Sequence, residues 1–228
     1  MPTTLIHPDD TADSPDFQTL ACATLPEKWQ ALFHILKPTW TEDTAWLNDA
    51  KNDWHALTDK DGDEAVDWLI RLFNRTFSDS DTVLVRGDDE PEYFPKTTDS
   101  PAQLVFAHGY FQSGLHEISH WCIAGEKRRT LPDFGYWYSP DGRDAELQSA
   151  FEQVEIRPQA IECLFSLAIG RKFFVSADNL TGDKNQNSTF AHDVYAKTRA
   201  FLDAPLTLPK DAKRLLWGFL FLCQPNFS

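Results

Sequence analysis

Two histidines four residues apart, with a glutamate beside the first, form the stretch of this chain best suited to chemistry. The run reads His116-Glu117-Ile118-Ser119-His120. Residues at positions i and i+4 of a helix share one face, so both imidazoles can reach a single metal ion. Glu117 would then point near that ion, where it could hold or deprotonate a bound water. The H-E-x-x-H spacing therefore predicts a metal-dependent enzyme with Glu117 as its candidate catalytic residue.

The residues around this run have the pattern of a helix with one buried face. Apolar side chains recur at helical intervals, at Phe111, Leu115, Ile118 and Cys122. Gly125 is a typical residue to end such a helix. This context favours a metal site over the alternative, in which the histidines only pack or form hydrogen bonds.

A catalytic metal site usually needs a third protein ligand and an open position for water or substrate. One subclass of metalloproteases extends the motif with a glycine and a histidine further along the helix. Ile123 and Glu126 occupy those two positions here, so this subclass is excluded. The remaining option is a carboxylate from a second helix.

A polar stripe on a long helix, expected over about Ala145–Ile169 and ended by Gly170, offers that carboxylate. The stripe consists of Glu152, Glu155, Gln159 and Glu162. Acidic groups on a partly buried face need partners, because burying an unpaired charge is costly. Glu155 is central in the stripe and is the expected third ligand, with Glu152 as the alternative. A stripe that faces solvent and binds no metal is the competing interpretation.

Two histidines and one carboxylate predict a divalent metal but do not identify it. This ligand set holds Zn²⁺ in many hydrolases and Fe²⁺ in oxygenases. With zinc, the chain would be a zincin-like metallopeptidase in which Glu117 is the general base. A protein-interaction domain with a structural metal is a third hypothesis, and it requires a fourth protein ligand that closes the site.

Composition limits the partners and the compartment. The formal charge of −14, from 35 acidic and 21 basic residues, argues against broad nucleic-acid binding, which needs a basic surface. No apolar run approaches the length of a membrane span, and the first residues lack the pattern of a signal peptide. The four cysteines are scattered and form no C-x-x-C pair, as expected for reduced thiols in a cytoplasmic protein.

Hydrophobic periodicity predicts a mainly helical α+β domain with a small sheet and a zincin-like metal-binding helix pair. Residues 1–63 are expected to form an N-terminal helical extension, and residues 64–228 the catalytic, metal-binding domain. Besides the two helices described above, the pattern predicts helices at about 26–36, 41–57, 64–77, 189–202 and 209–223. It predicts strands at 82–85 and 103–107, and a short strand at 172–177.

Several of these segments together resemble the elongation factor P hydroxylase family. The resemblance covers roughly residues 64–182. It is carried by the segments 86–91, 108–111, 116–125, 133–144, 151–155, 157–160, 175–176 and 178–180. Residues 1–63 look like an extension beyond the usual start of the family.

The resemblance implies a non-haem, metal-dependent monooxygenase whose protein substrate is the translation factor elongation factor P. The enzyme would use molecular oxygen to hydroxylate the β-lysylated lysine of that factor as the last step of its maturation. His116, His120 and Glu155 match the metal site, for which the family is expected to use Fe(II). Glu117 would then orient a ligand or water, or handle a proton. The sequence has no nucleotide or flavin fingerprint, so an external reductant is expected.

Four further residues are candidates for the substrate pocket. His108 could line the pocket or hydrogen-bond behind the metal ligands, although a lone histidine is as often structural. Tyr136 and Tyr138 could form a wall along the aliphatic part of a lysyl arm. Asp178 is a candidate acid for its ammonium group, with Asp141 and Asp144 as alternatives. Turn and cap positions explain such aspartates equally well.

Overall fold

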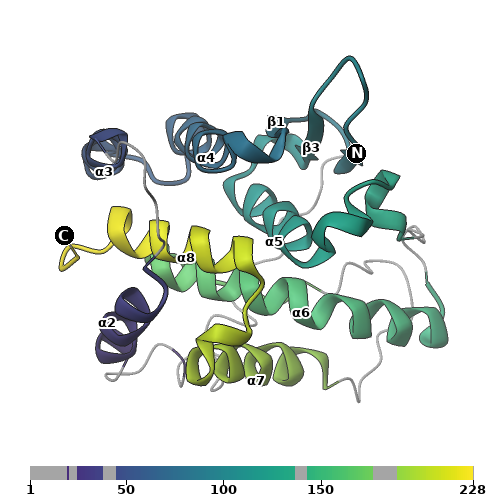
Figure 1. Ribbon diagram of the computed structural model, residues 1–228. Helices are drawn as coiled ribbons and strands as arrows, with labels where there is room; N and C mark the ends of the chain where they lie inside the picture. Colours follow the sequence, from purple (N-terminus) through teal and green to yellow (C-terminus); the bar gives the residue numbers. More distant parts are fainter. Residues whose placement is uncertain (1–19, 21–24, 38–44, 137–142, 177–188, 228) are drawn as a thin grey trace.

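A small three-stranded sheet lies at one end of a mainly helical molecule (Figure 1). The computed structural model describes residue 20 and residues 25–37, 45–136, 143–176 and 189–227. In the sheet, β3 (Ala102–Phe106) is central, with β1 (Thr82–Arg86) parallel to it and β2 (Glu92–Phe94) antiparallel. Alternate residues of β3 are buried, which places one face of the sheet on the core.

Two of these strands were predicted, and the third was missed. The predicted strands at 82–85 and 103–107 correspond to β1 and β3 within one residue at each end. The short strand β2 follows the turn-rich segment 86–91, and its three residues are too few to show an alternating pattern. The strand predicted at 172–177 is wrong over residues 172–176, which form no strand, and residue 177 lies outside the described residues.

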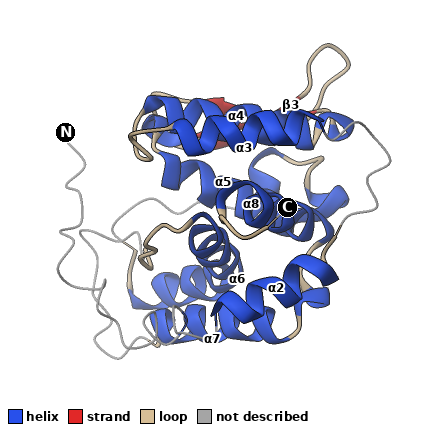
Figure 2. Cartoon of the chain, turned by 90° about the vertical axis from the view of Figure 1, so that its left-hand side faces the viewer, coloured by secondary structure: helices blue, strands red, loops and turns tan. Residues whose placement is uncertain are grey.

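Beside the sheet lie α3 (Ala45–Ala56) and α4 (Asp63–Thr76), and further helices follow below in layers, in both views (Figures 1 and 2). First come α5 (Phe111–Arg128) and α8 (Lys210–Cys223), then α6 (Ala145–Ile169) and then α7 (Phe190–Asp203). α4 and α5 contact the sheet. α6 packs against α5 on one side and against α7 and α8 on others. α6 is therefore the central helix, and its second half is buried nearly all around.

The N-terminal helices share the core of the rest of the chain. α2 (Leu25–Ile35) and α3 (Ala45–Ala56) both contact α8. The ring of Phe33 stacks on Trp217 with 5.2 Å between centroids, and the ring of Trp54 lies 4.5 Å from that of Trp68. These aromatic contacts join α2 and α3 to the single buried cluster of apolar side chains. The mainly helical α+β fold predicted from the sequence is confirmed.

The two helices expected to carry the metal ligands have clear ends. Gly125 has a φ of 67° and interrupts the helical conformation of α5, although a last turn continues to Arg128. α6 begins after Asp144, whose carboxylate accepts hydrogen bonds from the backbone N–H groups of residues 146 and 147. It ends at Gly170, where φ is 84° and the backbone N–H of Arg171 bonds to the carbonyl of Ser166 at 2.8 Å.

A pair of glycine substitutions tests why a glycine ends α6. The two possible reasons are its left-handed backbone conformation and a lack of room for a Cβ atom. A Cβ atom at Gly170 or at Gly218 within α8 would meet no atom within 4 Å. Only Gly170 has a left-handed φ. We expect Gly170→Ala to lower the free energy of unfolding by about 1 kcal/mol, and Gly218→Ala to raise it by roughly 0.4–1 kcal/mol. Urea denaturation of both variants checks this, and equal effects of the two substitutions would contradict it.

Candidate metal centre

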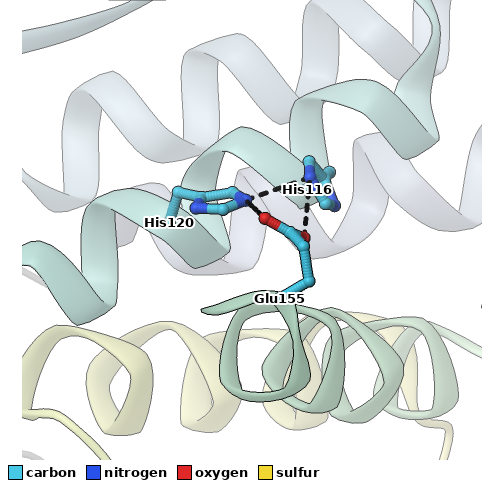
Figure 3. A group of neighbouring side chains, drawn as sticks. All are labelled: His116, His120 and Glu155. Atoms are coloured by element: carbon cyan, nitrogen blue, oxygen red, sulfur yellow. Dashed lines mark hydrogen bonds and ion pairs between the residues drawn. The ribbon is translucent and has the colours of Figure 1, made fainter. Parts of the chain in front are cut away.

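The helix pair α5 and α6 brings the predicted metal ligands together (Figure 3). His116 and His120 project from successive turns of α5 toward the carboxylate of Glu155 on α6. The two helices run antiparallel, because His120 pairs with Glu155 while Gln112, two turns earlier, pairs with Glu162. The interface thus assembles the site from residues that lie far apart in the sequence.

The donor atoms converge on one point. The Nε2 atoms of His116 and His120 are 3.1 Å apart. One oxygen of Glu155 lies 3.2 Å from the Nε2 atom of His120, and its other oxygen lies 3.7 Å from that of His116. Bonds of about 2.0–2.2 Å to a metal place two ligands of one ion roughly 3.0–3.5 Å apart. The donor set therefore fits a single divalent cation after small side-chain adjustments.

The charges at the site also favour the binding of a cation. Burial alone would lower the pKa of His116, but attraction from Glu162, with its hydrogen bond, and from Glu155 raises this pKa to about 10. Burial would likewise raise the pKa of Glu155, yet the charge and hydrogen bond of His120, and then His116, lower it to about 2. A proton on His116 thus balances the buried carboxylates in the metal-free protein, and a divalent cation can replace it.

Glu117 lies beside the ligands without joining them. Its side chain is half-buried. Burial raises the pKa of Glu117, and the nearby charges of Glu155 and Glu162 add to this effect, while His116 and His120 oppose it. The result is a carboxyl group with an increased tendency to hold a proton next to the metal position.

A second set of polar side chains supports the ligands from behind. Glu162 accepts from the ring of His116 at 2.8 Å between Oε2 and Nδ1. Gln159 donates to Glu155 at 3.3 Å and is also bonded to the backbone of Ser176 through both atoms of its amide group. Glu162 and Gln159 belong to the polar stripe predicted on α6, but the sequence predicted no role for them behind the ligands. The helical spacing of these two residues from Glu155 was the sequence feature that could have indicated this role.

The alternative ligand predicted from the same stripe lies elsewhere. Glu152 is buried and accepts a hydrogen bond from Gln148 at 3.3 Å. Among the described residues, the group that could hold a metal consists of His116, His120 and Glu155, and it includes neither Glu152 nor a fourth ligand. Three protein ligands is the number found in typical catalytic metal sites, whereas a closed structural site has four.

One of the predicted pocket residues lies next to the ligands. The ring of Tyr136 is 6.5 Å from that of His120 in an edge-to-face arrangement. The guanidinium of Arg128 stacks over the ring of Tyr136, with its central carbon 3.7 Å from the ring centroid. Asp133 and Phe134 precede this tyrosine in left-handed conformations, with φ of 45° and 56°. Such backbone outliers often occur where a functional side chain must be positioned.

The remaining pocket candidates are placed differently. His108 is exposed in the turn after β3, where its ring lies 6.0 Å from that of Tyr110. Asp144 serves as the N-cap of α6, which is the structural role considered for it. Tyr138, Asp141 and Asp178 lie outside the described residues. Tyr136 is thus the pocket candidate for which the described residues give a position at the metal centre.

The fold and the site define a class of protein: an α+β protein with an open two-histidine, one-carboxylate site between two antiparallel helices. A comparison with protein families matches residues 72–220 to the elongation factor P hydroxylases. The chain belongs to this family. It is 45% identical over 149 residues to the elongation factor P lysine hydroxylase of Haemophilus influenzae, covering 64% of this chain and 83% of that relative. None of the described helices is long and apolar enough to cross a membrane.

Metal binding should stabilise the folded protein, because an unfolded chain does not present the three ligands together. At a free Co²⁺ or Zn²⁺ concentration of 100 times its Kd, we expect roughly 2.7 kcal/mol of added stability. His120→Ala should abolish the corresponding rise in Tm. The exposed His55 provides a matched control, and His55→Ala should keep the rise. Equal rises in both variants would exclude this site as the place of binding.

Proposed function

We propose that this protein is an Fe(II)-dependent monooxygenase that hydroxylates the β-lysylated lysine of elongation factor P. The observation that carries the proposal is the cluster of His116, His120 and Glu155 in a chain that belongs to the elongation factor P hydroxylase family. The relative's name specifies a lysine of elongation factor P as the site of hydroxylation. Iron as the metal and the β-lysyl group on the substrate lysine are proposed in addition to what that name specifies.

The reaction determines what must be supplied. One C–H bond of the substrate becomes C–OH, and the second atom of O₂ leaves as water. The balance needs two electrons and two protons in addition to O₂ and substrate. An external low-molecular-weight reductant or reductase would supply the electrons. Fe(II) bound by two histidines and one carboxylate is the centre that supplies oxygen activation in non-haem oxygenases, and the same ligands would suit Zn(II) as the alternative.

Glu117 is proposed to handle the protons. Because its pKa is raised, Glu117 holds a proton in a larger fraction of molecules than an ordinary glutamate does. It is close enough to the ligands to feel the charges of both histidines. We assign to Glu117 the delivery of a proton to the side of the site where oxygen is reduced.

Tyr136 is proposed to form part of the wall along the substrate. Its ring flanks His120, so a lysyl arm that reaches the metal position would pass close to it. The aliphatic part of the arm would pack against this aromatic ring, and we assign its ammonium group to the carboxylate of Asp178. Tyr138, Asp178 and His108 are further proposed members of the pocket.

The proposal includes an organisation of the chain and a cellular setting. We assign residues 64–228 to catalysis and residues 1–63 to an N-terminal helical extension. The start of the family match at residue 72 and the contacts of α2 and α3 with α8 support an extension that packs on the C-terminal helix. A translation factor as the substrate implies work in the cytoplasm, without a need for binding nucleic acid or membrane.

The intact mass of β-lysylated elongation factor P tests the activity. After incubation with this protein, Fe²⁺, ascorbate and O₂, the substrate should gain one oxygen atom. His116→Ala and His120→Ala should each abolish the gain, because two ligands do not hold the metal. His34→Ala, which changes an exposed histidine of α2, should not. No gain of mass with folded, iron-loaded protein would refute the proposal.

Substitution of Glu117 separates its role from that of the ligands. We expect Glu117→Gln to bind Co²⁺ like the unchanged protein but to hydroxylate roughly 10²–10⁴-fold more slowly, since the amide cannot transfer the proton. Hydroxylation at the normal rate would remove Glu117 from the mechanism. The zinc metallopeptidase alternative makes a different prediction: the zinc-loaded protein would cleave a peptide panel, and Glu117→Gln would stop the cleavage.

A further inference from the structure

Glu162 is a buried carboxylate next to the metal centre that is not itself one of the three ligands. Its side chain is almost fully buried and lies on α6, two turns after Glu155. Its Oε2 atom is 2.8 Å from the Nδ1 atom of His116. A carboxylate oxygen is a hydrogen-bond acceptor, so we assign the hydrogen of this bond to the Nδ1 atom of His116.

This proton position determines which nitrogen of His116 can bind a metal. A neutral imidazole with hydrogen on Nδ1 has its free lone pair on Nε2. The Nε2 atom of His116 faces the Nε2 atom of His120 at 3.1 Å and Glu155 at 3.7 Å. When a cation replaces the second ring proton of His116, the hydrogen bond to Glu162 leaves the coordinating lone pair on Nε2, which faces the centre of the donor cluster.

Both oxygens of Glu162 are engaged by residues of α5. The side-chain amide of Gln112, one turn before His116, donates to the Oε1 atom of Glu162, and His116 bonds to its Oε2 atom. The amide of Gln112 also donates to the hydroxyl of Ser166, one turn after Glu162 on α6, at 3.1 Å. These bonds restrict the rotation of the carboxylate that faces the imidazole.

We propose that Glu162 is the positioning residue of the metal centre: it fixes the tautomer and the ring orientation of His116 and increases the basicity of the coordinating nitrogen. A carboxylate behind a ligating histidine commonly has this effect, and its loss typically costs about 10–100-fold in metal affinity. The inference rests on the metal site of the proposed function. It does not depend on which substrate that site modifies.

Metal affinity measured with Co²⁺ alone tests this role without any hydroxylation. The affinity is obtained by titration in competition with a chelator, following the visible absorption of bound Co²⁺. We expect Glu162→Ala to bind about 100-fold more weakly and the nearly isosteric Glu162→Gln about 10-fold more weakly. Glu146→Gln removes the same charge from an exposed position of α6 and should leave the affinity unchanged. Circular dichroism confirms that each variant is folded.

The tautomer of His116 provides a readout that a merely stabilising contact would not change. In the Zn²⁺-loaded protein, long-range ¹H–¹⁵N spectra should show hydrogen on Nδ1 and metal on Nε2 of His116. The signal of the Nδ1 proton should shift or exchange faster in Glu162→Gln. The proposal is overturned if His116 carries its proton on Nε2, or if Glu162→Gln and Glu162→Ala bind Co²⁺ within twofold of the unchanged protein. An equal loss in Glu146→Gln would also overturn it.

This test is independent of the proposed function. If Co²⁺ binding and the tautomer behave as expected but elongation factor P gains no oxygen, the metal centre stands and the assigned reaction fails. If hydroxylation occurs and depends on His116 while the Glu162 variants bind Co²⁺ normally, the reaction stands and the positioning role fails.

Discussion

The attraction between buried carboxylates and imidazoles across the interface of α5 and α6 is the interaction on which the site depends. Glu155 and Glu162 lie on the buried face of α6, where unpaired negative charge would be very costly. His116 and His120 can pair with these carboxylates only because the two helices run antiparallel in one register. The neighbouring helices α5, α7 and α8 keep this register by packing against α6, whose second half is buried nearly all around. The pairing of buried charges and the hydrophobic packing therefore favour the same register of α5 and α6.

Much of this arrangement follows from local sequence patterns. The long helix ending at Gly170 has the bounds predicted from its periodicity and its stop signal, and the metal-binding spacing of His116 and His120 depends only on helical geometry. The choice of Glu155 over Glu152 followed from its central place in the polar stripe, and the cluster in the structure includes Glu155 alone of the two. These features repeat with the period of a helix, so a single sequence can reveal them.

Other features depend on contacts between distant segments and leave weaker traces. The pairing of His116 with Glu162 requires the antiparallel register of two helices, which no local pattern states. The strand predicted at 172–177 has a β-like composition, but the backbone of Ser176 is bonded by the side chain of Gln159 where a neighbouring strand would be needed. The left-handed turn before Tyr136 is likewise held by a tertiary contact, in which the backbone N–H of Tyr93 donates to the carboxylate of Asp133 at 2.9 Å.

The amide group of Gln159 joins a metal ligand to the backbone of another segment. It donates to Glu155 and clasps both the N–H and the C=O of Ser176, so the two are part of one hydrogen-bonded unit. Coupling between cation binding at Glu155 and opening of the backbone at Ser176 would be reciprocal. If cation binding stabilises the hydrogen-bonded position of Glu155, it also makes opening of the backbone at Ser176 less favourable, and opening there weakens cation binding by the same free energy. The stability of the backbone at Ser176 thereby becomes a measure of whether the metal centre is occupied.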